Sequence, residues 1–179
     1  GGKTAVNLPA AKNALGAFHP PVAVLADPVA LRTLPARELS SGLGEVMKVG
    51  FLRPPLLDRF ALQARRRRLD AALVAACARV KVEIVARDPR ERGERKLLNL
   101  GHTFGHGVEA AGGFSRWKHG EAVAVGTAFA FRLARRLGRV GDVEVARAER
   151  ALADAGLPTR LSPELARRAV TLMGHDKKR

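Results

Sequence analysis

The amino-acid sequence predicts a mainly α-helical protein, in which a helical domain follows the end of an α/β unit. From Pro35 onward, apolar residues recur at helical spacing in one segment after another. Residues typical of helix ends delimit these segments, namely Asp70, Gly138, Gly156 and Ser162. The opening of the chain lacks this periodicity. We therefore expect residues 1–34 to end an N-terminal α/β domain and residues 35–179 to form a C-terminal all-helical domain.

The first of these two parts contains one segment that suits a strand. Residues 22–26 are a short apolar run after two prolines, which favours a buried strand. Before it, residues 1–4 have the composition of a loop, and Lys12 and Asn13 form a polar break. Because one strand cannot form a sheet, we expect the other strands of this unit to lie outside this chain.

Seven helices are expected in the rest of the chain. The first starts at Pro35, which suits a first helical turn, and ends near residue 52, and the second follows Pro54. Asp70 is expected to cap the third, which extends to about residue 85 and is followed by a charged loop. The remaining four are expected over residues 95–109, 119–137, 143–155 and 163–173.

Composition excludes several classes of protein. The chain has 179 residues, of which 46% are hydrophobic and 27% charged, and its apolar runs are too short to span a bilayer. Cys77 is the only cysteine, and no charged segment followed by an apolar one opens the chain. We therefore expect a cytoplasmic protein with no disulfide framework and no membrane partner.

The chain is strongly basic, with a formal net charge of +15 from 32 Lys and Arg against 17 Asp and Glu. This surplus suits a nucleic-acid-binding protein, an enzyme for polyanionic substrates, or a basic part of a more balanced protein. Its densest run, residues 65–68, falls at an expected helix end, where cations complement the helix dipole. Because the chain has no Tyr, one Trp and no zinc-finger spacing, we expect no nucleic-acid partner.

One polar stripe points to chemistry. On a helix, Arg95, Asn99, His102 and His106 would fall within roughly 60° of arc. Two glycines lie among them, and a glycine inside a helix costs about 1 kcal/mol relative to alanine. The stripe therefore indicates that something approaches the backbone closely. The alternative is a solvent-exposed polar face whose glycines allow tight helix packing.

Histidines in this stripe could bind a metal ion. His102 and His106 are spaced so that both could reach one ion from a single helix, but Thr103 stands where a zinc peptidase has its catalytic Glu. Other candidate ligands are His119 and Glu45, because a carboxylate on an apolar helix is costly to bury without a partner. Glu45 could instead form a local surface ion pair with Lys48.

Lysines at three other places could bind phosphate or carboxylate groups. Lys3 follows two glycines, Lys12 is next to Asn13, and Lys81 lies on the third expected helix. None of these signals is specific alone, since the loop of a Walker lysine is missing around Lys3 and a helical lysine is usually only a solubilising residue.

Taken together and in order, these motifs resemble the 3-dehydroquinate synthase family, the NAD- and metal-dependent cyclases of the shikimate pathway. The resemblance spans essentially the whole chain, and residues 98–106 and 119–121 carry its most specific motifs. The other matching positions are residues 1–4, 12–13, 34–39 and 44–48, Cys77, Lys81, Trp117 and residues 176–178.

The resemblance implies roles for particular residues. It implies that Glu45, His102 and His119 bind the metal, zinc most simply and cobalt as an alternative, and that His106 lies beside the metal or contacts the substrate. Substrate contacts are further implied for Lys48, Lys81, Arg95 and Asn99, together with Lys3, Lys12, Asn13 and one of Lys177 and Lys178. The residues implied to lie at NAD are Lys3, Lys12, Asn13, Ala30, Leu31, Arg32 and Thr33.

The implied reaction converts 3-deoxy-D-arabino-heptulosonate 7-phosphate to 3-dehydroquinate and inorganic phosphate. Its substrate is a phosphorylated sugar acid, so a site rich in Lys and Arg suits its phosphate and carboxylate. In this family the metal polarises a sugar hydroxyl and NAD takes up a hydride transiently. Loss of phosphate, return of the hydride, ring opening and an aldol closure then give the carbocycle.

The chain departs from the family pattern in two ways. Ala5 and Ala11 stand where the family motifs commonly have glycine. The nucleotide-binding half of the family also lies outside this chain, so we expect this chain alone to be inactive and the full-length form to be a homodimer. The alternatives are a related sugar-phosphate cyclase with another substrate, a metal-dependent alcohol dehydrogenase, and a non-enzymatic basic helical module that binds nucleic acid or protein.

Overall fold

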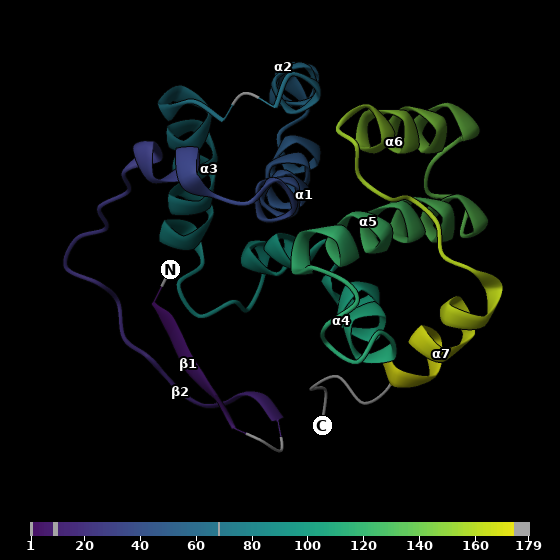
Figure 1. Cartoon of the computed structure of the whole chain (residues 1–179), viewed down its shortest axis with the longest axis horizontal. Coiled ribbons are helices and arrows are strands. Elements are labelled where there is room, and N and C mark those ends of the chain that lie inside the picture. The colour runs from purple at the N-terminus through teal and green to yellow at the C-terminus, as the bar shows by residue number, and fades with distance from the viewer. Residues whose placement is uncertain (1, 9–10, 68, 174–179) are drawn as a thin grey trace.

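The computed structural model of the chain describes residues 2–8, 11–67 and 69–173, with the side chains of all of these except residues 7 and 11–14. Within these residues the protein is mainly α-helical, as predicted, and a two-stranded sheet precedes the helices. Figure 1 shows the helices gathered into one body, with the hairpin extending along one side of it. Lys177 and Lys178, one of which is predicted to contact the substrate, lie outside the described residues.

A β-hairpin replaces the loop that was predicted at the start of the chain. β1 (Lys3–Leu8) pairs antiparallel with β2 (Ala11–Phe18). Lys12 and Asn13 therefore lie within a strand and not in a polar break. The sequence does not predict these two strands, because small residues such as Gly16 make their apolar alternation weak. Pairing between the strands, which a sequence pattern does not show, decides the structure.

The strand predicted over residues 22–26 is wrong. This segment has no regular structure, and its large apolar side chains are strongly exposed. Among the described residues, no strand lies beside it to take up its backbone hydrogen bonds, and an isolated strand is not stable in water. It leads into η1 (Pro28–Thr33), a 3-10 helix that begins where the Asp27 carboxylate accepts a hydrogen bond from the backbone N–H of Val29.

Six of the predicted helices are confirmed, with ends close to those expected. They are α1 (Ala36–Leu52), α2 (Pro54–Arg65), α3 (Ala71–Arg87), α5 (His119–Arg136), α6 (Asp142–Asp154) and α7 (Pro163–Met173). Asp70 caps α3 as predicted, because its carboxylate accepts a hydrogen bond from the backbone N–H of Leu73. Gly138 and Gly156 follow α5 and α6 with left-handed backbone angles, as C-capping glycines do.

The helix predicted over residues 95–109 is divided into two elements. η2 (Glu94–Asn99) is a 3-10 helix, and α4 (His102–Ala111) begins only after Gly101. Gly101 has a φ of 78°, in the left-handed region that glycine adopts without steric cost. A Cβ atom there would lie 2.5 Å from the hydroxyl oxygen of Thr127 on α5. The sequence indicated that something approaches the backbone closely at these glycines, and at Gly101 it is helix α5.

Helix α5 lies at the centre of the helical body (Figure 1). α1, α4 and α6 pack against it, α7 packs on α4, and α2 packs on α1. A separate apolar cluster around Phe60, Leu73 and Ile84 holds α3 against α1 and α2. This packing brings α1, α3, η2 and the first residues of α4 and α5 together on one side. No helix in the described part of the chain is both long and apolar enough to span a bilayer.

Candidate metal centre and substrate pocket

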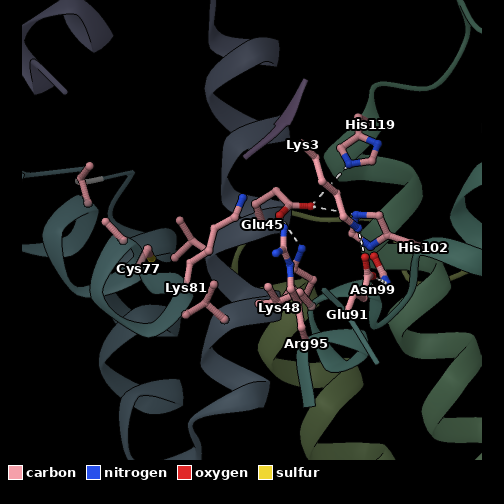
Figure 2. Close-up of a pocket in the computed structure, with 15 residues that line it drawn as sticks. Lys3, Glu45, Lys48, Cys77, Lys81, Glu91, Arg95, Asn99, His102 and His119 are labelled. Atoms are coloured by element: carbon pink, nitrogen blue, oxygen red, sulfur yellow. Dashed lines mark hydrogen bonds and ion pairs between the residues drawn. The ribbon is translucent and has the colours of Figure 1, made fainter. Parts of the chain in front are cut away.

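A pocket of about 560 Å³ lies where α1, α3, η2 and the starts of α4 and α5 meet. Figure 2 shows polar side chains reaching into it from these elements. Its charged, imidazole and amide residues are Lys3, Glu45, Lys48, Lys81, Glu91, Arg95, Asn99, His102 and His119. The structure thus brings all three predicted metal ligands together with most of the predicted substrate contacts.

Three potential metal ligands converge at one edge of this pocket, from three different helices. One carboxylate oxygen of Glu45, Oε1, lies 3.7 Å from Nε2 of His102 and 3.5 Å from Nε2 of His119. Ligand atoms that bind zinc tetrahedrally at about 2.0–2.1 Å lie roughly 3.4 Å from one another. Both distances are close to this spacing, and the three ligand atoms all lie within 4.8 Å of one another, as the ligands of a single ion would.

The bonding state of Glu45 tests whether a cation fits between these side chains. Its Oε1 atom is buried and has no hydrogen-bond partner among the described residues. A buried carboxylate oxygen without a partner is costly, and a bound cation would satisfy it. Two imidazoles and one carboxylate are also the donor set of catalytic zinc sites, which keep one coordination position open. The residues present therefore fit a divalent metal ion.

The charges around this centre favour an anionic Glu45. Burial alone would raise the pKa of Glu45, but the nearby imidazole of His119 and the ammonium group of Lys48 lower it to about 2. Burial, together with the charge of Lys48, lowers the pKa of His102 to about 4. The hydrogen bond to Glu109 and the nearby carboxylate of Glu45 raise the pKa of His119 to about 9. Glu45 is therefore ionised and His102 neutral at pH 7, the forms in which both side chains bind metals.

The ion pair considered as an alternative role for Glu45 is present, but inside the pocket and not on the surface. Nζ of Lys48 lies 2.5 Å from Oε2 of Glu45, and Lys48 is only 5% exposed. The two carboxylate oxygens of Glu45 thus face different groups, one the ammonium of Lys48 and the other the two histidines. The ion pair and the metal site are compatible.

The structure does not support binding of one metal ion by His102 and His106 together, which their spacing had suggested. The two rings contact each other edge to face, with centroids 5.6 Å apart. His106 groups with Glu109 and His119 and not with Glu45. Spacing along one helix could not reveal this, because Glu45 comes from α1 and reaches only the first turn of α4, at His102.

The loop between α3 and η2 positions the cationic side of the pocket. The carboxylate of Asp88 accepts hydrogen bonds from the backbone N–H groups of Arg92, Gly93 and Arg95. Arg95 itself is buried, and its guanidinium donates to the carbonyl of Pro89. Lys3 and Lys81 line the same pocket as Arg95, and burial with the charges of Arg95 and Lys81 lowers the pKa of Lys3. Such a cluster suits an anionic ligand.

Two carboxylates at the site were not singled out from the sequence. Glu91 lines the pocket, where it forms an ion pair with Lys3 and accepts a hydrogen bond from the amide of Asn99 at 2.5 Å. Glu109 is buried on α4 and contacts His119. Glu91 lies in a charged loop, where nothing in the sequence distinguishes it from its neighbours. Glu109 could have been found, because it is a carboxylate on the apolar face of a helix, and the same argument made Glu45 a candidate ligand.

The residues implied to bind NAD are not gathered in this pocket, apart from Lys3. Ala30, Leu31, Arg32 and Thr33 lie on η1 and do not line it. Lys12 and Asn13 lie on β2, with side chains outside those that the structure describes. A role for these residues at the nucleotide stays a prediction.

Cys77 lines the pocket, and we expect it to react slowly. Burial, with the charge of Glu45, raises the pKa of its thiol to about 11 from an ordinary value near 9. The reactive thiolate should therefore be roughly 100-fold scarcer at pH 7.5 than in an unfolded chain. We expect iodoacetamide to alkylate Cys77 of the folded protein at least that much more slowly than in urea, as followed by mass spectrometry. Equal rates would contradict the burial of this thiol.

Comparisons with known proteins agree with the predicted family. A family model described as the C-terminal part of 3-dehydroquinate synthase matches residues 42–179, and one described as its N-terminal part matches residues 1–41. The 3-dehydroquinate synthase of Xanthomonas axonopodis pv. citri is 53% identical over 99% of this chain, and that of Psychrobacter arcticus is 45% identical over 99%. The chain spans about half the length of these relatives, 51% and 47% respectively.

Solved structures of sugar-phosphate cyclases are also similar. The 2-epi-5-epi-valiolone synthase of Streptomyces hygroscopicus subsp. jinggangensis, solved with NAD+ and Zn2+, matches 98% of this chain and 52% of its own at a TM-score of 0.76 and 31% identity. A 2-deoxy-scyllo-inosose synthase, solved with carbaglucose-6-phosphate, NAD+ and Co2+, matches 99% of this chain and 50% of its own at a TM-score of 0.73 and 25% identity.

Proposed function

Because this chain belongs to the 3-dehydroquinate synthase family, we propose that it supplies the metal- and substrate-binding part of an enzyme that converts 3-deoxy-D-arabino-heptulosonate 7-phosphate to 3-dehydroquinate and phosphate. The observation that carries this proposal is the unsatisfied, buried oxygen of Glu45 between His102 and His119, beside a pocket lined by cations. A phosphorylated sugar acid needs both features, since its hydroxyls suit a metal and its anionic groups suit Lys and Arg.

The described residues have distinct proposed roles. Glu45, His102 and His119 hold a divalent metal, zinc or cobalt, which when bound supplies Lewis acidity to a sugar hydroxyl. NAD+, which the two similar cyclases bind, supplies reversible hydride acceptance. Lys48, Lys81 and Arg95 bind the phosphate and carboxylate of the substrate, and Asn99 orients it by hydrogen bonding. Lys48 also keeps Glu45 ionised, because their ion pair opposes protonation of the carboxylate.

Several further expectations belong to this proposal. His106, whose ring contacts those of His102 and His119, lies beside the metal or contacts the substrate. The division into residues 1–34 and 35–179 is supported by the start of α1 at Ala36, after a hairpin whose contacts are mainly internal. We also propose that the full-length enzyme is a homodimer, that it works in the cytoplasm, and that this chain alone does not turn over substrate.

An assay of phosphate release tests the function. We would compare this chain alone with a fusion in which the N-terminal half of the Xanthomonas relative precedes it, each with NAD+ and zinc. We expect phosphate release only from the fusion, and only with a bound metal. A heptulose phosphate that lacks the carboxylate should react about 100-fold more slowly, because a buried charge-assisted contact contributes roughly 3 kcal/mol.

Three outcomes would contradict parts of this proposal. Turnover by the chain alone would show that it needs no N-terminal half. Equal rates with both substrates would favour a related cyclase with another substrate, as the similarity to 2-epi-5-epi-valiolone synthase allows. Salt-dependent binding of DNA or RNA without metal uptake would favour the non-enzymatic basic module.

A further inference from the structure

Glu109 is a buried carboxylate that the proposed reaction does not use. It lies on α4, where it is 5% exposed, and its neighbours Val108 and Ala111 belong to the apolar core. A carboxylate in such surroundings is costly unless a hydrogen-bond donor meets it. Its Oε2 atom lies 3.3 Å from Nδ1 of His119, so a proposed metal ligand is one such donor.

The two nitrogens of the His119 ring face two different carboxylates. Nδ1 faces Glu109 at 3.3 Å, while Nε2 faces the unsatisfied oxygen of Glu45 at 3.5 Å. An anionic carboxylate only accepts hydrogen bonds, so Nδ1 must carry a proton that it donates to Glu109. When the imidazole is neutral, its lone pair is then on Nε2, directed toward Glu45 and the metal centre.

His102 shows the same arrangement with a different acceptor. Its Nδ1 lies 3.2 Å from the carbonyl oxygen of Leu100, which also can only accept, and its Nε2 faces Glu45 at 3.7 Å. Both histidines therefore present Nε2 to the centre. For His102 the backbone before α4 imposes this orientation. His119 is the first residue of α5 and its side chain is 39% exposed, so a side chain of another helix has to impose it.

His106, Glu109 and His119 could themselves be considered as the ligands of a metal ion, since their ligand atoms also lie within 4.8 Å of one another. Two observations favour the centre at Glu45 instead. The buried Oε1 of Glu45 has no hydrogen-bond partner among the described residues, whereas Oε2 of Glu109 already accepts from His119. Glu45 also faces the pocket, which Glu109 does not line.

We propose that Glu109 is a positioning residue, which holds the ring of His119 so that Nε2 is presented to the metal centre. This inference rests on the proposed metal site and extends it by one residue. Glu109 contacts neither the metal nor the substrate and acts through His119. Loss of a carboxylate that orients a metal-binding histidine typically weakens metal affinity about 10- to 100-fold.

Two substitutions at Glu109 test this role. Glu109→Gln keeps the volume and an acceptor but removes the charge, whereas Glu109→Met removes the acceptor. We would measure zinc affinity by competition with a chelator, the visible spectrum of the Co2+ form, and thermal unfolding of the metal-free protein. We expect zinc affinity to fall about 10-fold for Gln and about 100-fold for Met, with shifted Co2+ bands and an unchanged unfolding temperature for the Gln variant.

Glu149→Gln is the matched control, because Glu149 is another partly buried carboxylate, paired with Arg132 away from the pocket. It should leave zinc affinity unchanged. Wild-type affinity in Glu109→Gln would overturn the inference, and this variant decides the matter if Glu109→Met does not fold. A loss as complete as that caused by Glu45→Gln would also overturn it, since Glu109 would then be a ligand. If the wild-type protein took up no zinc, the metal site itself would be refuted.

Discussion

Replacing Glu45 by Gln is expected to weaken zinc binding about 1,000-fold. The substitution keeps the shape of the side chain and an acceptor for Lys48, but it removes the anionic oxygen that faces His102 and His119. Three protein ligands share a binding free energy of roughly 10 kcal/mol or more, so the loss of one should cost about 4 kcal/mol. Metal analysis after dialysis should find one zinc per wild-type chain and almost none in this variant.

His119→Ala should have the same effect, because it removes a second ligand of the same ion. Glu83→Gln is the control, since Glu83 is an exposed carboxylate of α3 that only pairs loosely with Arg53. It should retain a full equivalent of zinc. Equal metal content in the wild-type protein and both ligand variants would refute the metal centre and, with it, the proposed chemistry.

The helices could be predicted from the sequence because their causes are local. Apolar periodicity marks the buried face of each helix, and Asp70 and Gly138 mark helix ends by their own side-chain and backbone preferences. The break before α4 could not be predicted in this way. Gly101 adopts a left-handed conformation under Thr127 of α5, a contact between residues that are distant in the sequence.

The metal centre, like the break before α4, depends on contacts between residues that are distant in the sequence. Spacing could only compare residues on one helix, so it paired His102 with His106. The structure places Glu45 next to His102 and His119 instead, because α1 and α5 pack against each other and the start of α4 lies beside them. The residues alone offered Glu45 and His119 only as further candidates, and the resemblance to a family selected the three ligands that the structure brings together.

The structure shows where the cations behind the net charge lie. Arg37, Arg87 and Arg132 form ion pairs with Glu121, Glu94 and Glu149 outside the pocket beside the candidate metal centre. A smaller group, with Lys48, Lys81 and Arg95, lines the pocket itself. The charge of the pocket thus has a direct use in binding an anion. Most of the other described Lys and Arg side chains are exposed, so the rest of the surplus lies on the surface.

A stability prediction follows from the contact between α1 and α5. A Cβ atom on Gly120 would lie 1.7 Å from the backbone carbonyl oxygen of Ser41, and one on Gly44 would lie 2.2 Å from the carbonyl oxygen of Gly120. These glycines directly neighbour the ligands His119 and Glu45. The close approach of the two backbones therefore sets the distance between those ligands.

Gly120→Ala is expected to destabilise the metal-free protein by about 3 kcal/mol, because the clash is with rigid backbone and the helices must separate. Zinc affinity should fall as well, since ligands have to be held within about 0.5 Å of their working geometry. Urea unfolding with and without zinc measures both effects.

Gly42→Ala is the matched control for this substitution. Gly42 lies on α1 two residues before Gly44, but a Cβ atom there would meet nothing within 4 Å. Alanine restricts the unfolded chain and favours the helix, so this variant should be about 0.5–1 kcal/mol more stable than the wild type and bind zinc equally well. If Gly120→Ala were as stable and as zinc-competent as Gly42→Ala, backbone contact between α1 and α5 would not be what sets the metal centre.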